Sequence, residues 1–394
     1  MSFLIALVFV PPALALCALA LVFAAEVFAA FAQDPARPAD EGERGDAAIV
    51  IPAHNEGAGV VATIENVRTQ MTANDRLIVV ADNCSDDTAE QARAAGAEVI
   101  ERTDPARRGK GYALQFGVDH LRADAPSVVV FLDADCRMAA NALDRIVRRA
   151  RVMNRPVQAL YLMAPPEGAD AKAAISAFAW LLINDVRMSG MQKLAGFSRL
   201  TGAGMAFPWP LIAYTDLASG EIVEDLALTI KMIDAGAAPY LDKSAVVTSV
   251  LASSDKGAAT QRARWEHGSL NMARKMAPGL FAKGLSGDRK ALAMALDLAI
   301  PPLTVFAALI AAGVALSILP ALFGVLAPMK LCLWAGVIFV ASLVAAWAAY
   351  GREAAPPEAL SGVFGYLVSK LKVYGEEGRR SAEGWTRTDR GDGK

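Results

Sequence analysis

The stretch SVVVFLDAD at residues 127–135 decides the fold of this chain. Its apolar run is unbroken up to Leu132, which is typical of a strand covered on both faces of a sheet. Asp133 and Asp135 follow where such a strand would end. Two carboxylates at positions i and i+2 can both turn into a cleft there and share a hard cation such as Mg²⁺ or Mn²⁺. Taken alone, an Asp-x-Asp motif is also compatible with a turn that carries solvated acids.

Further strand-like runs lie on both sides of this stretch, separated by helical patterns such as residues 141–151. They begin at residues 47, 76, 97 and 156 and read AAIVIPAHNE, RLIVVADN, AEVIER and PVQALYLMA. Apolar strands that alternate with helices predict an α/β fold with a mostly parallel sheet covered on both faces. Ligands of such sheets gather at the carboxyl ends of the strands, where the polar motifs of this chain fall.

The first two strands end in polar residues that suit a nucleotide. Pro52 and Glu56 stand at the end of the first strand, and Asp82 stands at the end of the second. Acid and amide groups at adjacent strand ends can form hydrogen bonds with a base edge and with ribose hydroxyls. Residues 85–88, directly after Asp82, are better explained as the N-cap of the next helix.

A basic, glycine-bearing segment, RRGKG at residues 107–111, opens another helix. Its Lys110 can reach a phosphate, and backbone N–H groups at a helix start point outward. The segment lacks the spacing and the terminal Ser/Thr of a Walker A loop. A solvated turn is the alternative interpretation.

The composition favours a lipid environment over a nucleic-acid partner. Hydrophobic residues make up 54% of the chain and charged residues 20%, and the formal net charge of −2 offers no field for a polyanion. The three histidines form no HExxH or HxxxH cluster, so any metal site must rely on carboxylates. The four cysteines form no CxxC pair, which fits a reducing, cytosolic setting.

Three apolar segments are long enough to span a membrane. Residues 3–25 contain no charge, and two further segments, 303–326 and 331–350, are separated by a short hinge. A cleaved signal peptide is the alternative for the first segment, although it lacks a basic n-region. Buried helices of a soluble core are the alternative for all three. Residues 291–302 are also apolar, but Asp297 and Pro301-Pro302 indicate an interfacial or broken helix.

Basic residues flank the two apolar segments 303–326 and 331–350. Arg289 and Lys290 precede them, and further basic residues lie in the tail from residue 370 onward. The positive-inside rule places both sides in the cytosol, which predicts a multi-pass protein of the cytoplasmic membrane with its main domain in the cytosol. Residues 358–374 have one apolar helical face and are expected to lie on the membrane surface. The expected parts are a transmembrane helix at 1–32, a linker at 33–46, an α/β domain at 47–277, entry helices at 278–302, two transmembrane helices at 303–350, and an interfacial helix with a tail at 351–394.

Seven motifs in register resemble those of the family 2 glycosyltransferases. Between residues 49 and 268 they read IPAHNE, ADNCSDDT, GKGYAL, FLDADC, TGAGMAF, VEDLALTIKM and QRARW. The last three are similar to the membrane-embedded branch that includes cellulose, chitin and hyaluronan synthases. The resemblance implies a GT-A fold, a nucleotide-sugar donor that is usually a UDP-sugar, Mg²⁺ or Mn²⁺, and inversion at the anomeric carbon.

The resemblance also implies roles for the residues already singled out. Pro52, Glu56 and Asp82 would hold uridine, and Lys110 would bind the donor. Asp133 would face the ribose or phosphate side of the donor and share the metal with Asp135. Asp225, beside Glu224, would be the general base, since inverting transfer needs a carboxylate to take the proton of the acceptor hydroxyl. An acidic first helical turn is the alternative for Glu224 and Asp225.

The QRARW motif adds residues for the pyrophosphate and the acceptor. On a helix, Gln261, Arg264 and Trp265 stand at i, i+3 and i+4 and share one face. Gln261 and Arg264 would then face the pyrophosphate, and the indole of Trp265 would face an acceptor sugar. An interfacial tryptophan flanked by arginines is the alternative. Gly202 would line the acceptor entrance, where glycine allows close approach; a simple turn is the alternative.

The chain departs from the large synthases in having three expected spans. Three helices are too few to enclose a hydrated polymer, so a single transfer to a lipid-linked or saccharide acceptor is the main expectation. Processive synthesis would require an oligomer or an export partner. A non-catalytic nucleotide-sugar-binding regulator and a nucleotidyltransferase are the other open classes. The first should lack the base and the metal acids, and the second would have little use for spanning helices.

Overall fold

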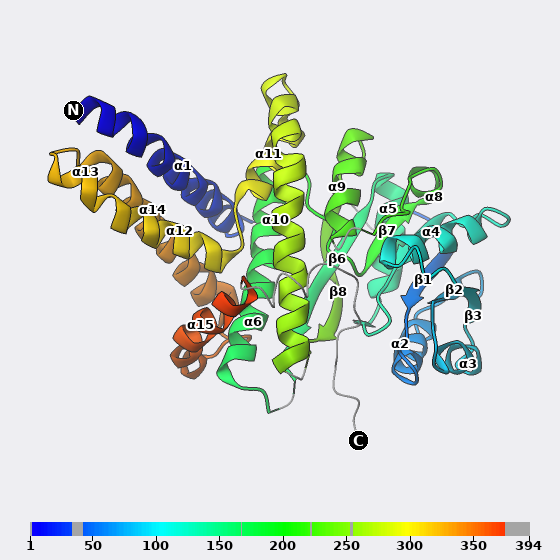
Figure 1. Cartoon of the computed structure of the whole chain (residues 1–394). Coiled ribbons are helices and arrows are strands. Elements are labelled where there is room, and N and C mark those ends of the chain that lie inside the picture. Colours follow the sequence, from blue (N-terminus) through cyan, green and yellow to red (C-terminus); the bar gives the residue numbers. More distant parts are fainter. Residues whose placement is uncertain (1, 34–41, 167, 221–222, 253–254, 375–394) are drawn as a thin grey trace.

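The computed structural model describes residues 2–33, 42–166, 168–220, 223–252 and 255–374. Most of the expected linker and the basic residues after 374 lie outside the described residues. Figure 1 shows two parts: a sheet with its covering helices, and a bundle of long apolar helices to one side of it. The long helix α10 stands between these parts.

The sheet has eight strands in the order β3-β2-β1-β4-β7-β6-β8-β5. Strands β3, β2, β1 and β4 run parallel, β7 is antiparallel to both of its neighbours, β6 and β8 are parallel, and β5 is antiparallel to β8. The expected mixed, mostly parallel sheet is thereby confirmed. The strand bounds are β1 Ala47–Ala53, β2 Arg76–Asp82, β3 Glu98–Arg102, β4 Val128–Phe131, β5 Arg137–Met138, β6 Val157–Ala164, β7 Met205–Pro208 and β8 Tyr240–Val250.

The apolar strands are buried on both faces because helices cover each side. In β1, Ile49 and Ile51 pack into one core with α2 (Gly59–Arg68) and α5 (Ala142–Met153). The alternate residue Val50 packs into a second core with α4 (Lys110–Leu121) and α9 (Glu224–Asp234). Successive residues of a strand point to opposite faces because the strand is pleated. Helices cover both faces, so the strand ends stay open for the site.

Further helices pack around the sheet, and one of them carries the QRARW motif. A single helical rod comprises α6 Ala171–Leu181, the π-helix η1 Leu182–Arg187 and α7 Met188–Ala195. A long helix, α10 Asp255–Leu285, carries the QRARW motif and runs through the expected domain boundary at residue 277; α11 Arg289–Ala299 follows it. The two short helices are α3 Thr88–Ala94 and α8 Trp209–Ile212.

Three helical segments are long and apolar enough to cross a membrane: Ser2–Ala29, Leu303–Leu322 and Ala327–Gly351. They comprise α1 Ser2–Ala29, α12 Leu303–Leu316, α13 Ile318–Leu322, α14 Ala327–Ala346 and η2 Trp347–Gly351. Figure 1 shows α1 beside α12 and α14, and Phe23, Phe306 and Phe339 are buried together where these helices meet. The chain ends its described part with the 3₁₀ turn η3 Pro357–Gly362 and α15 Val363–Val373.

Helix α1 also packs directly against the sheet domain. At Gly190 of α7, an added Cβ would lie 1.7 Å from the carbonyl oxygen of Glu26, so no other residue fits there without displacing α1. Beside this contact, Arg187 Nε lies 2.7 Å from the Glu26 carboxylate. The N-terminal helix is therefore seated on the rest of the molecule by a close backbone approach and a buried ion pair.

Candidate active site

The loops after β1 and β2 are tied together at the carboxyl edge of the sheet. His54 Nδ1 lies 2.7 Å from the Asp82 carbonyl oxygen, and the backbone N–H of Ser85 donates to Asn55 Oδ1 at 2.7 Å. The Gly57 N–H donates to Thr88 Oγ1 at 2.8 Å. Parallel strands end at the same edge of a sheet, so Pro52, Glu56 and Asp82 fall in one neighbourhood, as their places in the sequence predict.

Asp82 has a partner that the motifs do not reveal. Arg102, at the end of β3, donates to Asp82 Oδ1 at 2.6 Å, and its guanidinium lies over the Tyr112 ring, 5.5 Å from the centroid. Asp82 is buried, with 7% exposure. The acid at the end of β2 therefore presents an acceptor beside a fixed donor, which is the pattern complementary to a base edge that has a ring N–H next to a carbonyl.

Lys110 joins three parts of the site. Its Nζ lies 2.5 Å from Asp133 Oδ1 and 3.3 Å from Glu224 Oε1, and it donates to the Gly202 carbonyl oxygen at 2.9 Å. The two carboxylates raise the pKa of Lys110 against the opposing effect of burial, so the ammonium stays charged. The lysine at the start of α4 thus connects the β4 acids with the start of α9.

Gly202 allows the chain to pass close to these charges. Its φ is +89°, and a Cβ at this position would lie 3.4 Å from Lys110 Nζ and 3.7 Å from Asp225 Oδ2. A glycine is favoured here by the backbone conformation, whereas a Cβ would make only ordinary van der Waals contacts with the lysine and the acid. Gly202 therefore lies beside Lys110 and Asp225, and its place at the acceptor entrance stays a prediction.

Asp225 and Glu224 are adjacent acids in the first turn of α9. Burial, followed by the charge of Glu224, raises the pKa of Asp225 to about 7, against the opposing effect of Lys110. Burial likewise raises the pKa of Glu224, although Lys110 partly counteracts it. Glu224 is engaged with Lys110, whereas Asp225 is turned toward Gly202. A carboxyl group with a pKa near neutrality is suited to accept a proton during catalysis.

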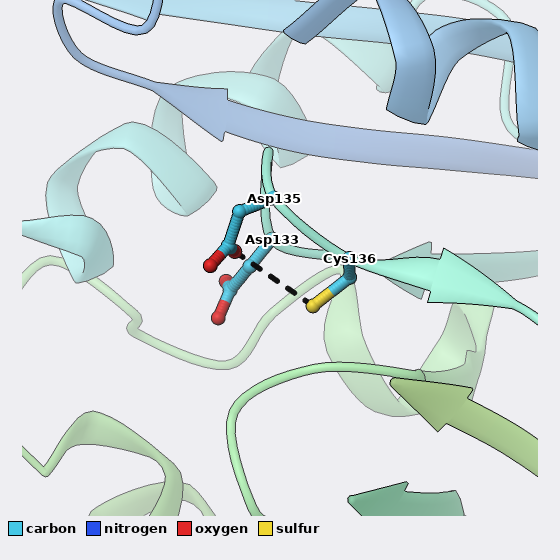
Figure 2. Close-up of side chains that lie close together, drawn as sticks. All are labelled: Asp133, Asp135 and Cys136. Carbon is cyan, nitrogen blue, oxygen red and sulfur yellow. Dashed lines mark hydrogen bonds between the residues drawn. The ribbon is translucent and has the colours of Figure 1, made fainter. Parts of the chain in front are cut away.

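Asp133 and Asp135 lie close enough together to hold one cation. Figure 2 shows both carboxylates pointing to the same side of the loop after β4, with Cys136 beside them. Ligand atoms of these three residues all lie within 4.8 Å of one another. Cys136 Sγ lies 3.8 Å from Asp135 Oδ1, and burial raises the pKa of its thiol well above the usual range. A neutral thiol is a poor ligand for a hard cation, so the oxygen donors Asp133 and Asp135 fit Mg²⁺ or Mn²⁺.

The residues of the QRARW motif line the same space. Gln261, Arg264 and Trp265 all line one cavity with Lys110, the β4 acids and the α9 acids. The Trp265 ring packs on Trp180 with ring centroids 4.7 Å apart, and Trp180 Nε1 donates to the Tyr161 carbonyl oxygen at 3.0 Å. Trp265 therefore faces the cavity and is also part of the packing between α10, α6 and the sheet.

This cavity has a volume of about 1420 Å³ and brings together most of the predicted site residues. Those in its wall are Lys110, Asp133, Asp135, Gly202, Glu224, Asp225, Gln261, Arg264 and Trp265. Pro52, Glu56 and Asp82 do not line it. They lie at the ends of β1 and β2, and the Arg102–Tyr112 contact connects their neighbourhood to the start of α4.

Several residues beside the site belong to none of the seven motifs. Arg102, Trp180, Arg187 and Arg199 each contact a site residue or line the cavity. The only signals available in the sequence are single charged residues next to apolar segments, such as Arg187 in the run from 171 to 194. Their partners lie far away along the chain, so the pairing becomes visible only in the folded structure.

The chain is similar to known glycosyltransferases. Residues 48–161 match the model of the glycosyl transferase family 2. A curated relative, glucosyl-3-phosphoglycerate synthase of Mycobacterium tuberculosis, is 37% identical over 93 residues, which is 22% of this chain. The match spans only 28% of the length of that protein.

The same fold occurs in a solved mannosyltransferase, PcManGT from Pyrobaculum calidifontis in complex with GDP-Man and Mn²⁺. The match has a TM-score of 0.54 at 17% identity and covers 86% of this chain and 98% of that one. At this identity the likeness shows the fold, and the GT-A fold class is confirmed.

Proposed function

We propose that this chain, which contains a family 2 glycosyltransferase domain and is therefore a glycosyltransferase, transfers a sugar from a nucleotide diphosphate donor to an acceptor at the cytosolic face of a membrane, with inversion. The observation that carries the proposal is the shared cavity of the β4 acids, Lys110 and Asp225. The expected donor is a UDP-sugar, and the expected acceptor is lipid-linked or a saccharide. Three apolar helices would hold the domain in the cytoplasmic membrane.

The donor would lie between the ends of β1, β2 and β4. Asp82 and Arg102 are suited to read the base, since a buried carboxylate stands beside a fixed guanidinium. Asp133 and Asp135 would hold a divalent cation, which offsets negative charge on the diphosphate when it is bound. Lys110, Gln261 and Arg264 supply further donors in the same cavity for phosphate oxygens.

The acceptor hydroxyl would lie between Gly202 and Asp225. Asp225 would take its proton as the oxygen attacks the anomeric carbon opposite the leaving diphosphate. The charge of Glu224, which lies beside Lys110, raises the pKa of Asp225 and so favours proton uptake by Asp225. One base is sufficient, because the departing diphosphate is stabilised by cationic groups and needs no proton.

A panel of radiolabelled nucleotide sugars tests this proposal. The full chain, purified in membranes, is offered each donor with Mg²⁺ or with Mn²⁺, and label is followed into lipid-extractable, polymeric and free-sugar fractions. Transfer from one donor with release of its nucleotide diphosphate supports the proposal, whereas failure of every donor contradicts it. Label in a polymer would favour the alternative, processive synthesis by an oligomer or with an export partner.

Asp225→Asn separates an enzyme from a nucleotide-sugar-binding regulator. The variant should bind the donor and lose transfer, because the amide cannot accept the proton. The matched control is Asp234→Asn, an exposed acid at the other end of α9 whose partner is Lys283. Equal activity of Asp225→Asn and the control would contradict the catalytic role of Asp225.

A further inference from the structure

The cavity that contains Asp225 continues to the first residues of a membrane-spanning helix. Its wall includes Ile300, Leu303 and Thr304, and Leu303 opens the apolar segment Leu303–Leu322. Ile183 of the π-helix η1 also lines it. One continuous space therefore reaches from the catalytic acids to the level at which the chain enters the bilayer.

Helix α15 gives the same cavity a second border with the membrane surface. Its residues Tyr366 and Ser369 line the cavity. On its other side, Phe364 is 77% exposed, and Val363 and Leu367 are also exposed. Exposed apolar side chains on a surface helix next to spanning helices are typical of a helix that lies in the membrane interface. Figure 1 shows α15 between α6 and the bundle of apolar helices.

The charges at this membrane end balance one another. Arg187 Nη2 lies 2.7 Å from Asp297 Oδ1, and its Nε lies 2.7 Å from Glu26 Oε2. Arg199 Nη1 lies 3.0 Å from Asp297 Oδ2. Two guanidinium groups are thus matched by two carboxylates, which leaves no net positive charge among them. A site built for a phosphate would keep an unmatched arginine or lysine for it.

Two polar atoms beside the catalytic acid have no partner among the described residues. Arg199 Nε and Thr201 Oγ1 are buried and form no hydrogen bond there. Thr201 precedes Gly202, which lies next to Asp225. Buried polar atoms are costly when unpaired, so they point to a ligand that completes them. A donor N–H and a hydroxyl next to a base suit an alcohol headgroup.

We infer that the acceptor is a membrane lipid with an alcohol headgroup, which enters the cavity along Ile183 and Leu303 and presents a hydroxyl to Asp225. This inference rests on the proposed function. The lipid oxygen forms a bond to the anomeric carbon while the bond from that carbon to the donor phosphate breaks. The proton passes to Asp225, and the nucleotide diphosphate leaves. The product is a glycoside of the lipid.

A lipid phosphate is the acceptor that the membrane end of the cavity disfavours. Its phosphate group would bring negative charge up to Glu224 and Asp225, and the two arginines at the membrane end are already neutralised by Glu26 and Asp297. The two products differ chemically. A glycoside of an alcohol survives mild acid, whereas a glycosyl phosphate is cleaved by it.

The test uses the full chain in phosphatidylcholine vesicles that contain a total lipid extract of its source organism. The labelled donor from the panel is added, and the product is extracted into organic solvent and treated with mild acid. We expect the label to stay in an acid-stable lipid. Label that mild acid releases, or label confined to water-soluble saccharide, overturns the inference while leaving the proposed function intact. Absence of any donor turnover contradicts the proposed function itself.

Two bulky substitutions test the entry path. Leu303→Trp and Ile183→Trp should each lower lipid labelling about tenfold, which corresponds to about 1.4 kcal/mol. The matched control is Leu309→Trp on the same helix, a residue that is 45% exposed and outside the cavity wall. Unchanged lipid labelling in both cavity variants would overturn the inference.

Thr201→Val provides a test that does not depend on a bulky side chain. It removes the hydroxyl at nearly constant volume, so folding is expected to persist. We expect the KM for the lipid to rise about fivefold with the KM for the donor unchanged, as for the loss of about one hydrogen bond. An unchanged KM for the lipid would contradict the placement of the headgroup beside Thr201, even if the tryptophan variants fail to fold.

Discussion

The two ends of the cavity differ in how their charges are matched. At the donor end, Lys110 contacts Asp133 and Glu224, and the acids Asp135 and Asp225 line the same cavity. At the membrane end, Arg187 and Arg199 face Glu26 and Asp297 in equal number. Surplus negative charge in a partly buried site calls for a cation, whereas a matched buried network holds helices together. Changes at the first end should therefore affect chemistry, and changes at the second should affect stability.

The largest effect is expected from Asp225→Asn at the donor end. Loss of a general base lowers kcat by about 10²- to 10⁴-fold, while the KM for the donor should change little. Steady-state kinetics with the identified donor measure both values. A large rise in the donor KM with kcat preserved would show that Asp225 binds the donor and does not act as the base.

Arg187→Met at the membrane end should instead lower the free energy of unfolding by about 3–5 kcal/mol, because it leaves Glu26 and Asp297 with too little positive charge. Chemical denaturation in detergent micelles measures the loss. The matched control is Lys283→Met, which breaks the exposed pair with Asp234 and should cost less than about 1 kcal/mol. Equal losses of unfolding free energy in the two variants would contradict a stabilising role for the membrane end of the cavity.

The pH dependence of transfer follows from the raised pKa of Asp225, about 7. The base must be deprotonated, so kcat/KM should rise with pH through this value by about tenfold per unit below it and level off above it. Glu224→Gln removes the neighbouring negative charge and should move the midpoint to lower pH. A midpoint that moves upward, or a profile without a rise near neutral pH, would contradict this assignment.

The smallest effect is expected from Arg102→Lys beside the base-binding acid. The ammonium keeps the charge but cannot reproduce the fixed guanidinium geometry, so the donor KM should rise about fivefold, from about 1 kcal/mol of lost hydrogen bonding. The control is Arg93→Lys, an exposed arginine paired with Glu101 on the surface. A rise in kcat/KM for donors with a different base would identify Arg102 as a specificity residue.

Much of the donor end can be predicted from local sequence. The apolar runs of β1, β2 and β4 each lead directly into their polar residues, because the strand and its ligand-binding end are adjacent in the chain. Sequence patterns do not predict β7 and β8. In β8, Asp242, Lys243 and Ser244 interrupt the apolar pattern, and the pairing with β6 shifts register between Ala159 and Leu160.

The membrane end is much harder to predict, because it depends on distant pairing. Glu26 and Arg187 are separated by 161 positions, and Arg187 and Asp297 by 110. The expected span at 3–25 stops one residue before Glu26, and α1 continues to Ala29. No local pattern in residues 182–187 indicates the π-helix that places Arg187. Each of these features arises from packing between elements rather than from a local pattern.

The fit between Gly190 and the backbone of Glu26 gives the N-terminal helix a role beyond anchoring. A generic apolar helix grafted in its place would still keep the chain in a bilayer. Such a graft would lack the carboxylate opposite Arg187, and a side chain at residue 190 would prop α1 away from α7. Chimeras with foreign leader helices are therefore expected to reach the membrane and yet assemble a loosened enzyme, so the first helix belongs to the folding unit.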